Sequence, residues 1–324
     1  MDPYRYCEWI TYRHYENFPV ASWLLPVSLR PHVAAVYAFA RAADDFADES
    51  RYQGRALDLL GQWRESLKAC ANGRGAQHPI FLALADTIRK KGIPVQLLDD
   101  LLTAFTLDVT KRRYADWGEL MTYCRYSANP VGRLVLLLHG IRDEELHRRS
   151  DDICSGLQLA NHWQDLRIDV ARDMIYVPQD LMRQHGVTDS DLKSRLVGRL
   201  GRLRDSADRS GPHRGPSLNF RLARRPSADT MAARLQMSAP PRSLPPADLR
   251  PLMRELVERA RALFDSGEPL IRQLRGGLKL EIKLTLLGGR AILDRIEAAD
   301  YDVFNHRPVL SKPDKMGLLA RALF

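Results

Sequence analysis

Residues 41–49, RAADDFADE, place four carboxylates within six positions of an alanine-rich stretch. The stretch follows good helix formers without a breaker, so we predict that it is helical. Side chains four residues apart lie on one face of a helix, which makes Asp44 and Asp48 neighbours and puts Arg41 one turn before Asp44. Like charges at this spacing destabilise an isolated helix by about 0.2–0.5 kcal/mol, so this face requires a compensating cation.

A second acidic stretch, LQLANHWQDLRID, follows more than a hundred residues later at 157–169. At helical spacing Asn161, Asp165 and Asp169 share one face, with Gln158 beside Asn161. The large apolar residues of the stretch fall roughly opposite, as expected for a helix that packs on its neighbours. The polar stripe is therefore narrow and set against an apolar one.

The rest of the chain predicts an all-α protein. Its 324 residues, 45% hydrophobic and 27% charged, can bury one large core or two modest ones. Apolar residues recur at three- and four-residue spacing in most segments, several of which end at glycine, and we find no convincing run of alternating strands. We expect one helical domain over residues 1–324, interrupted by an irregular insertion at 201–250.

The proposed insertion carries most of the net charge of +9. From Arg199 to Arg250 there are 11 Arg and 4 Asp, no Lys or Glu, and seven prolines. This composition is typical of an unstructured segment. Nucleic-acid binding would favour aromatic residues among the basic ones, and only Phe220 is present, so we expect no nucleic-acid partner.

Compartment and cysteine usage indicate an intracellular protein. The first residues lack the basic start and apolar run of a signal peptide, and no apolar run approaches the roughly 18 residues that span a bilayer. The cysteines, Cys7, Cys70, Cys124 and Cys154, are widely separated, which fits reduced core thiols. We expect a cytoplasmic location, with peripheral association at the inner face of the membrane compatible with it.

The two acidic helices predict a magnesium site. Mg²⁺ prefers oxygen ligands and commonly binds one or two carboxylates together with substrate phosphate oxygens. Several such ions held between two helices would bind a diphosphate and stabilise it as a leaving group, which predicts ionisation of an allylic or cyclopropylcarbinyl diphosphate. The alternative is that both stretches are merely solvated faces; their joint occurrence in an all-α chain favours the metal site.

These residues resemble the squalene/phytoene synthase family, the head-to-head prenyl synthases, with a first DxxxD and a second NxxxDxxxD motif. The stretches HYENFPVASWLLP, YCRYSANPVGRLVL and GGRAILDRIEAADYDVFNHRPVLSKPDK are most similar to its hopanoid-pathway branch, the HpnC-type hydroxysqualene synthases. The resemblance covers most of the chain outside the arginine-rich segment. It implies a helical isoprenoid-synthase fold, a single-domain helical bundle with a central cavity between the two acidic helices.

By the same resemblance the metal ligands would be Asp44, Asp48, Asn161, Asp165 and Asp169. Asp44, Asp48 and Asp165 would thereby serve catalysis, and Arg41 would contact diphosphate. The branch would ionise presqualene diphosphate, rearrange the cation and capture water to give hydroxysqualene. Squalene would result if hydride replaced water, and squalene or phytoene synthesis by condensation of prenyl diphosphates is the alternative; no GxGxxG fingerprint is present, and we do not expect NADPH.

Further residues are assigned to the same site. Tyr37 and Tyr126 are candidates for lining the cation pocket with their π faces, although both residue types are more often core in a helical protein. The candidates for substrate binding besides Arg41 are Arg113, Gln158, Arg172 and Tyr176. For Arg113 a solvated helix end is an equally good interpretation.

One departure from the family pattern lies next to the second motif. Family members usually read GRIYLP, whereas this chain reads RDMIYVP, so Met174 replaces an arginine that would bind diphosphate. Arg172 would then have to reach in from two positions earlier. A non-enzymatic hypothesis therefore stays open, in which an inactive helical homologue binds anionic partners through its arginine-rich loop.

Overall fold

The computed structural model describes residues 2–13, 24–74, 77–204 and 247–323, with the side chains of 197–204 outside the description. The part described is helical throughout apart from connections and a single isolated bridge, so the all-α prediction is confirmed. Most of the predicted insertion, residues 205–246, lies outside the described residues. Its predicted start at 201 is helical, because α11 (Asp189–Arg204) continues through it.

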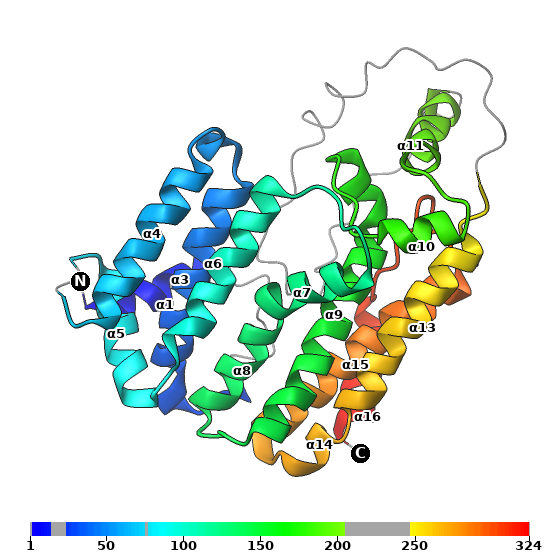
Figure 1. The fold of residues 1–324 in the computed structure, drawn as a ribbon. Coiled ribbons are helices and arrows are strands. Elements are labelled where there is room, and N and C mark those ends of the chain that lie inside the picture. Colours follow the sequence, from blue (N-terminus) through cyan, green and yellow to red (C-terminus); the bar gives the residue numbers. More distant parts are fainter. Residues whose placement is uncertain (1, 14–23, 75–76, 205–246, 324) are drawn as a thin grey trace.

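The helices form two groups around two hydrophobic cores (Figure 1). The N-terminal core is built mainly by α1 (Pro3–Arg13), α3 (Arg30–Asp48), α4 (Ala56–Ala71), α5 (Pro79–Lys91) and α6 (Val95–Thr110). Short 3₁₀ turns, Val27–Leu29 and Ser50–Tyr52, flank α3.

The C-terminal core contains the remaining long helices. It is built by α7 (Trp117–Ser127), α9 (Glu144–Ala171), α10 (Gln179–Gln184), α13 (Arg250–Gly267), α14 (Leu270–Gln273) and α15 (Gly276–Ala298), with α16 (Lys312–Leu323) packed on α15. α8 (Asn129–Leu138) joins the two groups, since Leu134 and Leu138 belong to the N-terminal core and Leu136 to the C-terminal one.

The long helix α9 has a well-defined start. The side chain of Asp143 accepts hydrogen bonds from the amides of Glu145 and Leu146, and two glutamates occupy the first turn, where the helix dipole favours negative charge. With 28 residues α9 is about 42 Å long. It packs along α13, α8 and α15 and is the central element of the C-terminal group.

Two glycines allow α9, α13 and α15 to approach closely around the ring of Phe264. A Cβ at Gly156 of α9 would lie 3.0 Å from Phe264 Cε1, and one at Gly289 of α15 would overlap both Phe264 Cζ and Leu157 Cδ2. Phe264 itself is fully buried. The three helices are thus fixed by one aromatic side chain that has no room for further methyl groups.

Gly289→Ala should therefore lower the free energy of unfolding by about 1–3 kcal/mol, because overpacking displaces the Phe264 ring. Gly288→Ala is the matched control: its Cβ meets nothing within 4 Å, and alanine raises helix propensity by up to about 1 kcal/mol. Urea unfolding of both variants gives the comparison. Equal stability of the two variants would contradict the close approach at Gly289.

Glu281 is an isolated carboxyl group on α15. Its Oε2 is shielded from solvent and has no hydrogen-bond partner among the described residues. Burial raises the pKa of Glu281 to about 7. At pH values above 7 the folded protein therefore carries a poorly solvated charge, whereas below the ordinary glutamate pKa both folded and unfolded chains are protonated here and the penalty vanishes.

Glu281→Gln should consequently raise the melting temperature at pH 8 and leave it nearly unchanged at pH 4.5. At pH 8 the free energy of unfolding should increase by about 1–3 kcal/mol, since each pKa unit corresponds to about 1.4 kcal/mol. Thermal melts of wild type and variant over this pH range test it. A gain that does not depend on pH would show that the charge is not its source.

Candidate active site

The first acidic stretch forms the last two turns of α3 and combines a buried carboxylate with a buried arginine. Asp44 is 7% exposed and Arg41 2%, while Asp48 is exposed. Arg41 Nη1 lies 3.3 Å from Asp44 Oδ2, and Arg41 also pairs with Asp45. Burial, followed by the charge of Asp48, raises the pKa of Asp44 well above its usual range. Asp44 is therefore a carboxylate that would gain from a further cation.

The second stretch forms a polar stripe along the C-terminal half of α9. Gln158, Asn161, Asp165 and Asp169 are all buried, as are the apolar residues on the opposite side of the helix. The predicted face is thus present at helical spacing. The structure adds that this face is enclosed by protein, whereas a solvated acidic face would be exposed.

A residue that the sequence interpretation missed neutralises Asp165. Arg307, which follows α15, approaches Asp165 Oδ1 with Nε and Nη2, each at 2.7 Å. Next to it Gln164 Nε2 donates to the carbonyl of Pro308 at 2.5 Å. Arg307 therefore attaches the connection between α15 and α16 to α9, although it lies 142 positions from Asp165 in the sequence.

Asp108 at the end of α6 links the two acidic helices. It accepts hydrogen bonds from the hydroxyls of Tyr123, at 2.7 Å, and Tyr176, at 3.2 Å. Its charge also contributes to the raised pKa of Asp44. Tyr176 stacks on His162 of α9 with ring centroids 3.7 Å apart. Tyr176, a predicted substrate-binding residue, therefore lies between α6 and α9, with its hydroxyl bound to a carboxylate.

The other predicted residues have different surroundings. Tyr37 is buried on α3 one turn before Arg41, and Tyr126 is half-buried and packs against the C-terminal core. Arg172 is half-buried at the C-cap of α9. Arg113 is held by a structural network, because it donates to Asp189 Oδ2 at 2.6 Å and to Asp173 Oδ1 at 2.7 Å.

These residues suit a magnesium ion that is shared between protein carboxylates and phosphate oxygens better than an ion whose ligands all come from the protein. In the described ranges no three Asp, Glu, His or Cys side chains gather closely enough to hold one ion. Asp44 Oδ2, however, is buried without a hydrogen bond, so one oxygen has unused acceptor capacity. Carboxylates that contribute one or two ligands each suit an ion that completes its octahedron with water and phosphate oxygens.

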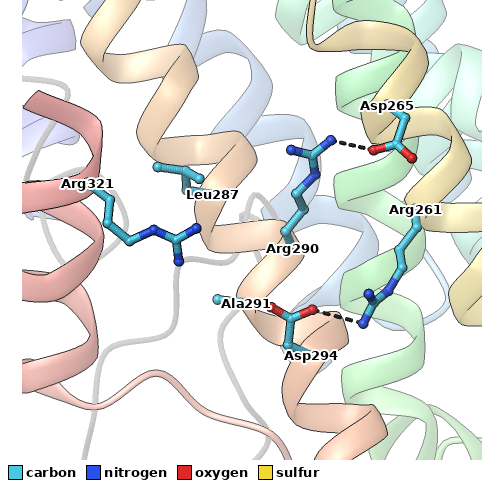
Figure 2. A pocket seen from close by; sticks show the side chains of 7 residues that line it. All are labelled: Arg261, Asp265, Leu287, Arg290, Ala291, Asp294 and Arg321. Carbon is cyan, nitrogen blue, oxygen red and sulfur yellow. Dashed lines mark hydrogen bonds and ion pairs between the residues drawn. The ribbon is translucent and has the colours of Figure 1, made fainter. Parts of the chain in front are cut away.

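A pocket outside the acidic helices does not compete for the role of active site. It lies between α13, α15 and α16 and has a volume of about 200 Å³ (Figure 2). Most of its charges are paired: Arg261 contacts Asp294 at 2.8 Å, and Arg290 contacts Asp265 and Glu268. Small-molecule sites usually measure about 300–1,000 Å³ and are mostly apolar, so this polar hollow is a poor fit for a hydrocarbon substrate.

No helix in the described ranges is both long and apolar enough to cross a membrane.

Curated relatives of this chain include hydroxysqualene synthases from two bacteria. The hydroxysqualene synthase of Rhodopseudomonas palustris is 42% identical over 178 residues, which are 55% of this chain and 60% of that enzyme. The hydroxysqualene synthase of Zymomonas mobilis is 41% identical over 181 residues, 55% of this chain and 59% of that enzyme. The matched stretches thus span about 60% of the length of these relatives.

Solved structures match over nearly the whole chain. The squalene synthase HpnC of Alicyclobacillus acidocaldarius superposes with a TM-score of 0.73 at 34% identity, covering 92% of this chain and 94% of that one. A dehydrosqualene synthase shares the fold, with a TM-score of 0.73 at 20% identity over 99% of this chain and 95% of that one. The sequence model of squalene/phytoene synthases matches residues 11–209 and 228–314. The chain therefore belongs to the squalene/phytoene synthase family.

Proposed function

We propose that this protein ionises presqualene diphosphate with the help of magnesium, allows the cyclopropylcarbinyl cation to rearrange, and adds water to give hydroxysqualene and diphosphate. The observation that carries the proposal is the presence of buried carboxylates on both helices, Asp44 beside Arg41 on α3 and Asp165 of α9 beside Arg307. The similarity to hydroxysqualene synthases supports this product class. Association with a membrane surface belongs to the same proposal, since a C30 substrate is poorly soluble in water.

The metal ligands in this proposal are Asp44 and Asp48 on α3 and Asn161, Asp165 and Asp169 on α9. When bound, magnesium neutralises the diphosphate and stabilises it as a leaving group. Among these residues Asp44 supplies a buried oxygen with no hydrogen-bond donor in the described part of the chain, and Asp165 supplies a carboxylate whose charge is balanced by Arg307.

The arginines bind the diphosphate in this proposal. Arg41 is 2% exposed and its Nε has no hydrogen-bond acceptor among the described residues, so it can donate to a ligand oxygen while Nη1 and Nη2 stay beside Asp44 and Asp45. Arg307 balances Asp165 while the site is unliganded. If Asp165 held a metal ion, Arg307 would be available to pair with the diphosphate of the substrate.

Aromatic side chains protect the cation after the diphosphate leaves. Tyr37 and Tyr126 offer π faces that would stabilise positive charge; Tyr37 is buried and Tyr126 half-buried. The hydroxyls of Tyr123 and Tyr176 are bound to Asp108, which fixes the ring positions. Gln158, buried on α9 three residues before Asn161, orients the substrate in this proposal.

Squalene is the second candidate product, because a solved structure with 34% identity carries the name squalene synthase. The two products differ in whether water or hydride captures the cation. Incubation with presqualene diphosphate and Mg²⁺, with and without NADPH, separates them by mass spectrometry of the C30 products. Hydroxysqualene without NADPH supports the proposal, and squalene formed only with NADPH replaces it.

Asp165→Ala should lower kcat/KM for presqualene diphosphate by about 100-fold or more, because even changes outside the first ligand shell of a metal typically cost 10- to 100-fold. Far-UV circular dichroism should show an intact fold. Glu145→Ala, at the exposed start of the same helix, is the control and should retain activity. Equal activity of the two variants would contradict a metal role for Asp165.

Arg307→Ala should make the thermal stability of the protein more dependent on magnesium. The variant loses about 1–3 kcal/mol of stability without metal, because a buried carboxylate loses its partner. Added Mg²⁺ should then raise its melting temperature more than that of wild type, since no guanidinium competes for Asp165. Arg295→Ala, which breaks the more exposed pair with Asp314, is the control. An unchanged magnesium response would contradict the exchange of Arg307 for metal.

A further inference from the structure

The loop that leaves α9 lies beside the segment that follows α6. The amide of Ile175 donates to the carbonyl of Arg112 at 3.0 Å, and the amide of Gln179 donates to the carbonyl of Tyr114 at 2.9 Å. These bonds bring two side chains from distant parts of the sequence together. Arg112 Nη1 lies 3.0 Å from the thioether sulfur of Met174.

The charge of Arg112 is not neutralised in this position. A thioether is a weak acceptor, and the remaining contact is a long one of 3.4 Å from Nη2 to the carbonyl of Val109. Arg112 is exposed and pairs with no carboxylate among the described residues. Its neighbour Arg113, in contrast, is paired with both Asp173 and Asp189. Two consecutive arginines thus have different roles, and only one of them holds the loop.

The guanidinium also lies at the edge of the acidic site. Arg112 follows α6 by two residues, and the last turn of α6 carries Asp108, whose charge acts on Asp44. Its contact residue Met174 donates its backbone amide to the carbonyl of Asp169 at 2.8 Å, so this contact directly follows the acidic end of α9. This uncompensated cation, near the ends of α6 and α9, provides donors for an anion bound at the acidic site.

We infer that Arg112 binds the diphosphate of the substrate at the rim of the site, from the position next to Met174. The inference rests on the proposed function and deepens it by adding a ligand from outside the two acidic helices. The guanidinium offers a planar fork of donors that matches phosphate oxygens, whereas the methionine beside it offers none. Exposure at the rim suits a group that meets the charged head of a substrate while its hydrocarbon enters first.

Arg112→Met tests the role, because it keeps an unbranched side chain and removes the charge. Its kcat/KM for presqualene diphosphate should fall by about 10- to 100-fold, as expected for loss of hydrogen bonds to a charged group. The affinity for inorganic diphosphate with Mg²⁺, measured by calorimetry, should fall by a similar factor. Arg321→Ala, which removes an exposed arginine at the pocket of Figure 2, should change neither quantity.

The double variant Arg112→Met with Met174→Arg provides a rescue. Since the two side chains touch, an arginine at 174 should return a guanidinium to the same place and restore at least part of the diphosphate affinity. Circular dichroism and thermal melts verify that each variant is folded. If the folded double variant recovers no affinity for diphosphate, the inference that a guanidinium at this place binds diphosphate is overturned.

The results separate this inference from the proposed function. If wild type converts presqualene diphosphate and Arg112→Met has wild-type kcat/KM and diphosphate affinity, the inference is overturned and the proposed function stands. If wild type does not convert presqualene diphosphate but binds inorganic diphosphate through Arg112, the substrate assignment falls and the inference stands. Wild type that binds no diphosphate in the presence of Mg²⁺ overturns both.

Discussion

The burial of carboxylates on two helices is the constraint on which the structure depends. Asp44, Asp165 and Asp169 are each less than 10% exposed, although an ionised carboxylate is strongly stabilised by water. The protein offsets this with two arginines, Arg41 from the same helix and Arg307 from the far end of the chain. Each arginine balances the charge of one buried carboxylate. A fold that served stability alone would replace these groups with apolar ones, since buried ion pairs are seldom net stabilising.

The two-core architecture explains how the carboxylate faces are kept apart and still oriented. α3 belongs to the N-terminal core and α9 to the C-terminal one, so each is fixed by its own apolar packing. In the part of the chain that the structure describes, α6, α7 and α8 form the main helix contacts between the two groups, and the backbone of Leu24 also approaches Gly277 of α15. Asp108 provides the polar part of this connection, because it binds Tyr123 and Tyr176 and acts on the charge of Asp44. The position of one acidic helix relative to the other is therefore determined by the connecting helices, with Phe264 and its facing glycines holding α9 in place on the other side.

The loop after α9 is fixed by electrostatics and by an unusual backbone conformation. Asp173 has a φ of +60°, in the left-handed region, at the position where the family usually has glycine. Lys193 and Arg113 pair with its carboxylate and lower the pKa of Asp173 to about 2. Arg113 also binds the backbone carbonyl of Asp173 and the carboxylate of Asp189. The ion-pair network of Arg113 thus fixes the shape of the loop. In this shape Met174 contacts Arg112, whose guanidinium pairs with no carboxylate among the described residues.

The sequence by itself determined the fold class and both acidic faces, because helical periodicity is local and residues four apart share a face whatever the surroundings. Asp44 with Arg41, and Asn161 with Asp165 and Asp169, lie where the spacing predicted. Only the tertiary structure decided that these faces are buried, that Arg307 pairs with Asp165, and that Arg113 binds Asp173 and Asp189. Those contacts join residues 60 to 142 positions apart, and no local pattern encodes such a distance. The sequence could not indicate the role of Arg112 for the same reason. Arg112 contacts Met174 only because the segment after α6 and the loop after α9 meet in the folded protein.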